Sequence, residues 1–247
     1  MTEPAWLALK SHSSRSWFVS FVSTVFSLES AETIIDLAFA EDSKATVLKH
    51  DRTTTVVVVD HSIDAAVNTN TESAGAVLSD LSSLVIKRYN ARSVWHHVSR
   101  SVRRTRAARC WQMSRRFAEL GVHVAMPVFA LERRVGFLRT DAYFVAEKVR
   151  GHELLSVFET LDEAQRQAVV NAVQGLFSVL SKHRLSHGDL KASNLLWDGH
   201  RLWVIDLDAA QAHRTARHWR KAHSKDRRRF LKNWADSPEL AAYFKGL

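Results

Sequence analysis

The chain has little cysteine, proline or glycine, and each shortage excludes a kind of structure. Its 247 residues include 1 Cys, 3 Pro and 8 Gly. The lone Cys110 cannot form an intramolecular disulfide, which is typical of a protein from a reducing compartment. So few Pro and Gly argue against long flexible linkers. We therefore expect one domain or two small lobes, long enough to bury a real core.

Long apolar runs are also missing. The one long run near the N-terminus covers residues 16–28, about 13 residues interrupted by serines, and is too short to span a bilayer. Lys10 and Arg15 precede it as they would in a signal peptide, but no small-x-small cleavage site follows closely. We expect a strand or a helix of a small lobe here, or an interfacial patch, rather than a secretion signal.

The chain also lacks a balance of charge, because its formal net charge is +9 at pH 7. Such an excess predicts an anionic partner: a nucleotide, a nucleic acid, a phospholipid surface or a polyanionic glycolipid. The cations concentrate in two predicted helical segments, residues 100–121 and 213–229. Trp219 in the second segment and Trp234 just beyond it are its apolar anchors. Nucleic acid is not the expected partner, because the zinc-finger, RNP and heptad patterns of known modules are absent.

The most informative stretch is a polar loop followed by a short apolar segment that leads to a carboxylate. The loop reads H-G-D-L-K-A-S-N over residues 187–194, and the segment reads V-I-D-L-D over residues 204–208. Asp189 and Asn194 are 5 residues apart, as in the H-R-D-x-x-x-x-N loop of kinases, and Asp206 follows 17 residues after Asp189. A polar turn would not require this ordered set, which predicts phosphoryl transfer.

The chemistry of phosphoryl transfer suggests a role for each of these residues. Asp189 is the predicted base that accepts the proton of the attacking hydroxyl, and Lys191 neutralises charge that develops on the γ-phosphate. Asn194 and Asp206 are the predicted Mg²⁺ ligands, because hard oxygen donors suit Mg²⁺ bound to phosphates.

Two further polar residues of the motif have less defined roles. We expect His187 to orient the loop through hydrogen bonds rather than to react. Asp208 should lie on the same strand face as Asp206, because strand side chains alternate. Its role, in metal binding or in holding the loop, stays open. Asp198 and Gly199 should form the turn between two short strands that connect the loop to Asp206.

Upstream, β-branched segments predict the strands of a nucleotide-binding lobe. Residues 46–49 and 53–60 read as a hairpin, but the turn between them lacks glycine. Any phosphate contact from this hairpin would therefore come from Lys49, Arg52 or threonine hydroxyl groups. A polar segment, residues 61–83, reads as an insertion or a loop.

The next strand, residues 84–89, carries the predicted phosphate-binding lysine, Lys87. In a kinase lobe the following helix supplies a glutamate for this lysine. The only acid in residues 100–121 is Glu119, so either Glu119 reaches back or the ion pair is absent. Residues 143–149 read as a strand leading to a hinge, where backbone groups of Glu147 and Val149 would meet an adenine edge.

Several stretches together resemble the lipopolysaccharide kinase family, bacterial core-heptose and Kdo kinases that are distant relatives of protein kinases. The resemblance runs from about residue 45 to the end, and one departure from it is Cys110, where family members often have an acid. The stretches that carry the resemblance are V-I-K-R-Y-N (85–90), L-G-V (120–122), M-P-V (126–128), H-G-D-L-K-A-S-N (187–194), I-D-L-D (205–208) and the basic tail (219–234).

The resemblance implies ATP and Mg²⁺ as cofactors, with Asp189 as base, Asn194 and Asp206 on the metal and Lys87 on phosphate. It implies an anionic glycolipid, the lipopolysaccharide core, as acceptor, and a cytoplasmic protein with peripheral contact at the inner membrane. The alternatives are a protein kinase or another small-molecule kinase, and a catalytically degenerate sensor or scaffold. No A-P-E-like anchor follows Asp206, which argues against a protein kinase.

The expected fold class is α+β, a two-lobed protein-kinase-like fold. A small β-rich N-lobe would cover residues 1–148, with the insertion at residues 61–83. A short helical C-lobe would cover residues 149–247 and hold the catalytic loop, the metal site and the basic tail.

Overall fold

The computed structural model describes residues 12–13, 16–23, 28–41, 43, 45–51, 53–60, 83–89, 105–135 and 138–247. The chain divides into two compact units. The first unit is Met1–Trp111 with Met126–Lys148, and the second is Gln112–Ala125 with Val149–Leu247. The sequence placed residues 112–125 in the first lobe. They pack with the second unit because His123 and Val124 pair with a strand of that unit.

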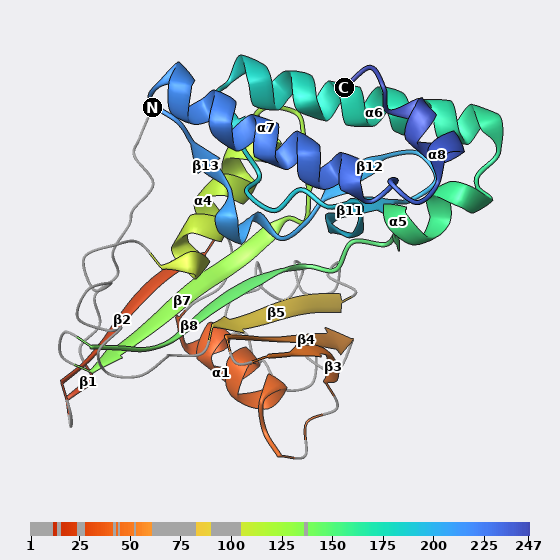
Figure 1. Ribbon diagram of the computed structural model, residues 1–247. Helices are drawn as coiled ribbons and strands as arrows, with labels where there is room; N and C mark the ends of the chain where they lie inside the picture. Colours follow the sequence, from red (N-terminus) through yellow and green to blue (C-terminus); the bar gives the residue numbers. More distant parts are fainter. Residues whose placement is uncertain are drawn as a thin grey trace. The chain divides into compact units, whose positions relative to one another are not determined.

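The first unit is built on an antiparallel sheet of seven strands (Figure 1). Its strands are rich in Val and Thr, which favour the extended conformation. The predicted hairpin is present as its last two strands. In sheet order the strands are β1 (His12–Ser13), β2 (Ser16–Ser23), β7 (Pro127–Val135), β8 (Leu138–Glu147), β5 (Ser83–Tyr89), β4 (Thr54–Asp60) and β3 (Thr46–His50).

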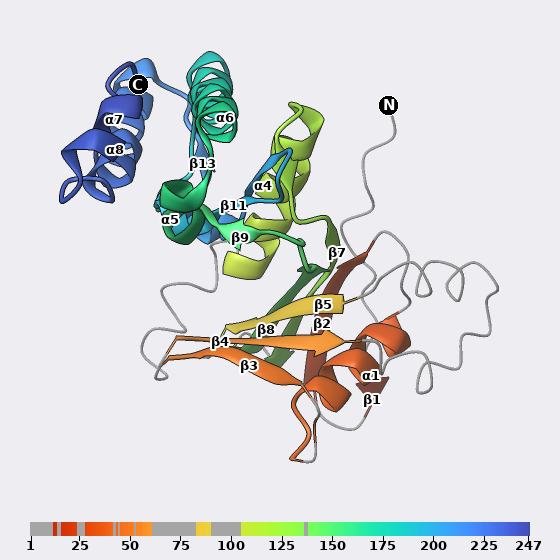
Figure 2. The same cartoon turned by 90° about the vertical axis from the view of Figure 1, so that its right-hand side faces the viewer.

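Helix α1 (Leu28–Ala38) covers one face of this sheet (Figure 2). Its buried side chains, among them Ile34 and Ile35, pack against alternate residues of four strands. Because strand side chains alternate between faces, the strand residues that alternate with these core residues point to the opposite face of the sheet. The strand residues that form this core with α1 are Val57, Val59, Leu84, Ile86, Val128, Phe129, Leu131, Tyr143 and Val145.

The start of helix α4 (Arg106–Glu119) lies on that opposite face. The Arg106 guanidinium stacks 4.9 Å from the Tyr89 ring centroid and donates to the Thr54 hydroxyl at 3.4 Å. The Thr105 hydroxyl donates to the buried carboxylate of Glu132. Lys87 shares its strand face with Tyr89, so the predicted phosphate lysine points to the same face as the start of α4.

Local hydrogen bonds explain where α4 begins and where it ends. The Thr105 hydroxyl accepts from the Ala108 amide at 3.1 Å and caps the first turn. Gly121 ends the helix at φ +78°, while the amides of Gly121 and Val122 donate to the carbonyls of Ala118 and Phe117. This is a Schellman motif, as the predicted glycine stop requires. The helix therefore begins later than the expected residue 100, and residues 100–104 lie outside the described residues.

The second unit is mainly helical, with two small sheets. Its four-stranded sheet has the order β6-β12-β11-β9, and β10 pairs with β13. The strands are β6 (His123–Val124), β9 (His152–Glu153), β10 (Leu185–Ser186), β11 (Leu195–Trp197), β12 (Leu202–Val204) and β13 (Gln211–Ala212). The helices are α5 (Leu154–Val157), α6 (Glu163–Lys182), α7 (Ala216–Lys232) and α8 (Pro238–Tyr243), with 3₁₀ turns η1 (Phe158–Thr160), η2 (Ala192–Asn194) and η3 (Leu207–Ala209).

An aromatic cluster ties the C-terminal helices to the rest of this unit. The Phe244 ring lies 5.0–5.2 Å from the rings of Phe158, Phe230 and Trp234. All four side chains are buried. The rings of Phe177 in α6 and Phe230 in α7 are 6.0 Å apart, so the two long helices are neighbours. The basic tail is thus packed through its aromatic residues, as its sequence indicates.

Some predictions for the first third of the chain concern residues that the structure does not describe. These are Arg52 and nearly all of the proposed insertion at residues 61–83, of which Ser83 begins β5. Most of residues 16–28 form β2, so the apolar run is a strand of the sheet. In the part of the chain that the structure describes, no helix is both long and apolar enough to cross a membrane.

Candidate active site

The H-G-D-L-K-A-S-N loop is held at both ends by short strands of the second unit. β10 brings the chain into the loop and pairs with β13, while β11 leaves it and pairs with β12. The connection between β11 and β12 is the predicted turn, where Asp198 Oδ1 accepts from the amides of His200 and Arg201. Gly199 takes the left-handed conformation that this turn needs, at φ +96°. The loop therefore starts and ends at fixed points.

Gly188 is required by its conformation and by its surroundings. Its φ is +83°, a region that other residues rarely adopt. A Cβ atom there would lie 2.4 Å from the carbonyl oxygen and 2.8 Å from the Cβ of Ala209. Glycine thus lets the catalytic loop lie directly against η3, the segment that follows Asp206.

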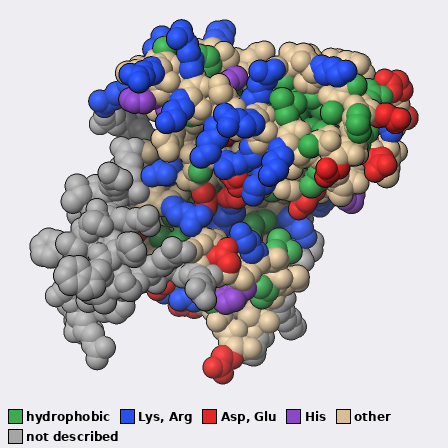
Figure 3. Space-filling model, in the orientation of Figure 1, with side chains coloured by type: hydrophobic (Ala, Val, Ile, Leu, Met, Phe, Trp, Pro, Cys, Tyr) green, Lys and Arg blue, Asp and Glu red, His purple; other side chains and the backbone are tan. Residues whose placement is uncertain are grey.

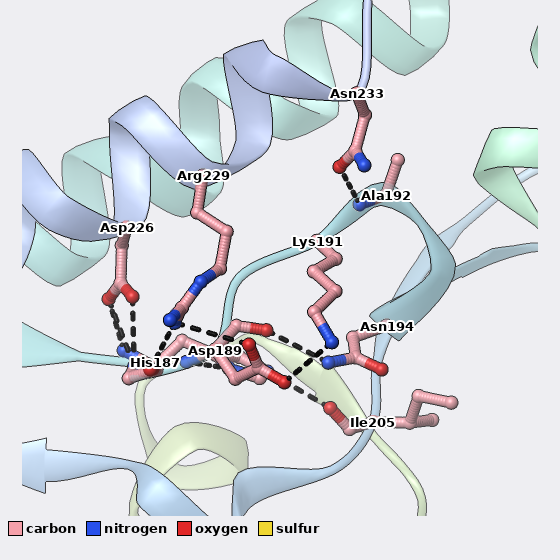
Figure 4. A network of polar contacts seen from close by, with 10 residues as sticks. His187, Asp189, Lys191, Ala192, Asn194, Ile205, Asp226, Arg229 and Asn233 are labelled. Carbon is pink, nitrogen blue, oxygen red and sulfur yellow. Dashed lines mark hydrogen bonds and ion pairs between the residues drawn. The ribbon is translucent and has the colours of Figure 1, made fainter.

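Helix α7 holds the same loop through its backbone (Figure 4). The buried Asp226 carboxylate accepts from the His187 amide at 2.7 Å and from the Gly188 amide at 3.0 and 3.1 Å. Asn233 Oδ1, just past the helix, accepts from the Ala192 amide at 2.8 Å. Since buried amide groups are costly to leave unpaired, these contacts fix the loop's path.

Two cations flank the carboxylate of Asp189. Lys191 Nζ lies 3.1 Å from Oδ2, and Arg229 Nη1 lies 3.1 Å from Oδ1. The same Arg229 nitrogen donates to the Gly188 carbonyl at 2.5 Å, which fixes the guanidinium in place. The side chains of Asp189 and Arg229 are each 31% exposed, so the pair is reachable from solvent. The site thus presents a carboxylate flanked by two cationic side chains, which could stabilise the negative charge of a phosphoryl group during its transfer.

His187 is buried inside the loop and orients it. Its Nε2 donates to the Ile205 carbonyl at 3.0 Å, and its Nδ1 accepts from the Asp189 amide at 3.3 Å. Burial lowers the pKa of His187, although the Ile205 hydrogen bond and the nearby carboxylates act in the opposite direction. A neutral ring matches this pattern of one donor and one acceptor. His187 thus links Asp189 to the residue just before Asp206.

Asn194 and Asp206 are brought close through their backbones. The Asn194 carbonyl accepts from the Ile205 amide at 3.0 Å, and Asn194 Nδ2 donates to the Asp189 carbonyl at 2.8 Å. This orients the Asn194 side chain. The described residues contain no group of three His, Cys, Asp or Glu able to hold a metal by themselves. An amide oxygen and a carboxylate nevertheless fit Mg²⁺, which typically takes few protein ligands and completes its shell with phosphates and water.

Asp206 does not sit on a strand, which corrects one expectation. β12 ends at Val204, and Asp206 adopts a left-handed conformation at φ +62°, immediately before η3. Asp208 lies within η3 and is buried, so the alternation that would have placed it beside Asp206 does not apply. Left-handed non-glycine residues cost free energy and concentrate at functional sites, where the surrounding structure holds them.

The predicted nucleotide-binding residues are distributed over both units. Lys87 lies half-buried on β5, between β4 and β8. Glu147 ends β8, and its amide donates to the Met126 carbonyl at 3.0 Å. Val149 begins the longer, C-terminal segment of the second unit. Lys49, one of the hairpin candidates, pairs with Asp51 at 3.1 Å, and Asp51 also accepts from the Thr53 hydroxyl.

The helix that should carry an acid for Lys87 shows none in its buried part. Cys110 and Trp111 are buried, while Glu119 is exposed at the end of α4, in the part that belongs to the second unit.

Three residues at this site were missed by sequence reasoning: Asp226, Arg229 and Asn233. They lie at spacings of three and four, which places them on one side of a helix. The available signal was Asp226, the only acid in a strongly basic segment. A lone acid among cations also has an ordinary reading as a surface ion pair, so only its burial reveals its role.

The chain was compared with known proteins. The model of the lipopolysaccharide kinase (Kdo/WaaP) family matches residues 62–239, well over half of the chain. A search of curated proteins found no match. Among solved structures, one described as "WaaP in complex with acyl carrier protein" is 18% identical, covers 82% of this chain and 87% of its own, and has a TM-score of 0.50. The structural likeness confirms the α+β, kinase-like fold, and the family match shows that the chain belongs to the lipopolysaccharide kinase (Kdo/WaaP) family and is a kinase.

Proposed function

We propose that this kinase transfers the γ-phosphoryl group of ATP to a sugar hydroxyl, of heptose or Kdo, in the inner core of lipopolysaccharide. The observation that carries the proposal is the carboxylate of Asp189 between Lys191 and Arg229, in a loop fixed by Asp226. Membership of the family supports the acceptor class, and the excess of positive charge suits an anionic glycolipid.

In the proposed step, Asp189 accepts the proton of the acceptor hydroxyl as its oxygen attacks the γ-phosphorus. The bond between that phosphorus and the β–γ bridging oxygen breaks, and ADP leaves with the electron pair. Lys191 and Arg229 lie within 3.1 Å of the Asp189 carboxylate, so both can also face negative charge on the transferred group. Arg229 is also held by the Gly188 carbonyl, and a charge fixed in this way lowers the cost of reorganisation during the reaction.

We propose the cofactor-binding residues from both units. Lys87 would contact phosphate, and the backbone of Glu147 and Val149 would meet the adenine edge. Arg52, which lies outside the described residues, remains a proposed phosphate ligand. Asn194 and Asp206 would hold Mg²⁺, which, when bound, neutralises phosphate charge.

The proposal places the enzyme at the cytoplasmic face of the inner membrane, since a lipid-borne acceptor is found there before export. A protein kinase and a catalytically degenerate sensor are the alternatives. The sensor is the weaker alternative, because a protein that only binds would not need Asp189 held between two cations.

The test is transfer of labelled phosphate from ATP, with Mg²⁺, to dephosphorylated lipopolysaccharide. We expect Asp189→Asn to lower kcat by roughly a hundredfold or more, because it removes the proton acceptor while keeping the side-chain shape. Asp236→Asn is the matched control, since Asp236 is exposed and takes no part in the contacts that hold the loop. It should retain full activity.

The outcomes separate the alternatives. Transfer to a protein substrate, with none to lipopolysaccharide, would replace the proposal by a protein kinase. ATP binding without transfer to any acceptor would favour the sensor. Heptose and Kdo are distinguished by locating the labelled phosphate on the isolated core oligosaccharide.

A further inference from the structure

One side of α7 carries a row of exposed cations that the catalytic loop does not use. Successive members are three or four residues apart, so at 100° per residue they lie within an arc of about 80°. They follow one another about 4.5–6 Å apart along the axis. We call these residues the α7 stripe: Arg217, Lys221, Lys225, Arg228 and Lys232.

The stripe faces away from the core of the unit. The buried residues of α7, Asp226 and Phe230, lie on the other side of the helix. Within α7 the only acid is Asp226, so no exposed acid balances the stripe. Its five cations make no ion pair with any residue that the structure describes. Figure 3 shows Lys and Arg side chains gathered along α7.

The neighbouring helix α6 shows that this charge is not general to the unit. α6 packs against α7 through Phe177, whose ring lies 5.6 Å from that of His223. Its exposed side carries mainly Gln, Asn, Ser and Ala, and its only Lys, Lys182, is in the last turn. A solvated helix face therefore needs no such charge in this protein, and the stripe calls for a partner.

We propose that the α7 stripe docks the enzyme on an anionic lipid surface. A straight row of cations over about 22 Å matches a flat array of headgroups, whereas a site for one phosphate would need converging side chains. The stripe has no exposed apolar side chain to insert between acyl chains, so binding is electrostatic. Rows of four to eight cations on a helix are typical of such binding.

The stripe also adjoins the catalytic loop. Arg229, which pairs with Asp189 at 3.1 Å, is about 40° beyond Lys225 around the helix. A lipid-borne acceptor on the docked surface would therefore meet the side of α7 that leads to Asp189. This last step rests on the proposed function, whereas docking itself does not.

The test measures sedimentation of the whole protein with vesicles of phosphatidylglycerol or of phosphatidylcholine, without ATP or acceptor. We expect binding to the anionic vesicles only, and loss of binding as salt rises from about 50 mM to about 500 mM. The variant Arg217→Gln/Lys221→Gln/Arg228→Gln should lower the partition coefficient by roughly a hundredfold. The control Lys182→Gln/Arg201→Gln/Lys245→Gln removes the same charge outside the stripe and should bind nearly as well as the parent.

A second measurement separates docking from recognition of the acceptor itself. With the acceptor embedded in anionic vesicles, the stripe variant should show a KM at least about tenfold higher and an unchanged kcat, because fewer enzyme molecules reach the surface. With a delipidated core oligosaccharide, both constants should match those of the parent. A higher KM with the oligosaccharide would instead make the stripe an acceptor subsite and overturn the proposal.

Three further results would overturn it. The stripe variant and the control could bind vesicles equally, or the parent could bind neutral vesicles as well as anionic ones. A random-sequence DNA duplex bound more tightly than the vesicles, and released by the stripe variant, would make nucleic acid the partner. Failure of phosphate transfer alone would reject the proposed function and leave the vesicle result standing.

Discussion

Gly188, His187 and Arg229 show how single residues shape this site around Asp189. Gly188 permits a backbone conformation and a close approach that any other residue would disturb. His187 connects the amide of Asp189 to the carbonyl of Ile205. Arg229 holds the carboxylate of Asp189 from a helix distant in sequence. Each of these roles predicts a different consequence of substitution.

Gly188→Ala should destabilise the protein by about 2–4 kcal/mol. The left-handed backbone and the overlap with Ala209 both contribute to this loss. Gly121→Ala is the matched control, because its φ of +78° is similar and no atom lies within 4 Å of the added Cβ. The control should lose only about 1–2 kcal/mol in urea-induced unfolding. Equal losses for the two variants would show that the contact with Ala209 is unimportant.

Arg229→Gln should lower kcat by roughly ten- to a hundredfold, because Asp189 loses one of its two cations and some of its orientation. The KM for ATP should change little. Arg229→Lys should restore part of kcat, since it keeps the charge but not the guanidinium geometry. Steady-state kinetics with both substrates measure these effects. Loss of ATP affinity with kcat intact would contradict the assigned role.

The histidines predict how stability depends on pH. Burial lowers the pKa of both His187 and His213 below the usual 6.5. The unfolded chain then binds more protons than the folded one just below pH 6.5, so stability is full above that pH and is lost as pH falls. Each histidine can contribute a slope of up to about 1.4 kcal/mol per pH unit.

Urea unfolding between about pH 5 and about pH 8 measures this slope. His187→Gln should reduce it, because glutamine can still donate to Ile205 but does not titrate. The carboxylate of Asp198 does not interfere, since hydrogen bonds lower its pKa and its contribution is lost only in stronger acid. An unchanged slope in His187→Gln would mean that other groups cause the dependence.

At the scale of elements, α7 has two sides with different tasks. Asp226 and Arg229, with Asn233 just beyond the helix, hold the catalytic loop, and Phe230 lies in the aromatic cluster. A further side of the helix is the cationic stripe. Anything that shifts α7 therefore also shifts the environment of Asp189.

Phe230→Ala should cost about 3–5 kcal/mol of unfolding free energy, because it leaves a cavity among the rings of Phe177, Trp234 and Phe244. Activity should fall as well, since the loop contacts of α7 depend on the position of the helix. Leu155→Ala is the control, because Leu155 is 42% exposed on α5, and it should stay within about 0.5 kcal/mol. Thermal unfolding and the transfer assay report the two effects separately.

At the scale of the molecule, proposed ATP-binding groups come from two units. Lys87 belongs to the sheet of the first, and Asn194 and Asp206 belong to the second. A ligand that binds the folded state raises its stability by an amount that grows with the logarithm of the ligand concentration divided by Kd. Binding and chemistry can therefore be tested apart.

ATP with Mg²⁺ at about 100 times Kd should stabilise the parent and Asp189→Asn alike, by about 2.7 kcal/mol. Lys87→Met at the same ATP concentration should show a much smaller shift of Tm, because a phosphate contact is lost. The measurement is thermal unfolding with and without nucleotide. An equal shift in Lys87→Met would remove Lys87 from the proposed site.

The sequence by itself determined the local features of this protein. The H-G-D-L-K-A-S-N loop, the Asp198–Gly199 turn, the glycine stop of α4 and the strands β3, β4 and β5 follow from short-range chemistry. Neighbouring residues set the conformation in these places, so their patterns were sufficient. The family and its kinase fold could also be inferred from the sequence, because the motif residues keep the spacing that the family's motifs have.

Only the tertiary structure decided which distant residues meet. The left-handed conformation of Asp206 and the burial of Asp208 depart from the strand that the local sequence predicted. The contacts of Asp226, Arg229 and Asn233 with the loop depend on where α7 packs. Aromatic contacts set that position, and no local pattern encodes it. Folding therefore turned part of a basic tail, which by composition could have been wholly solvated, into a support for the catalytic carboxylate.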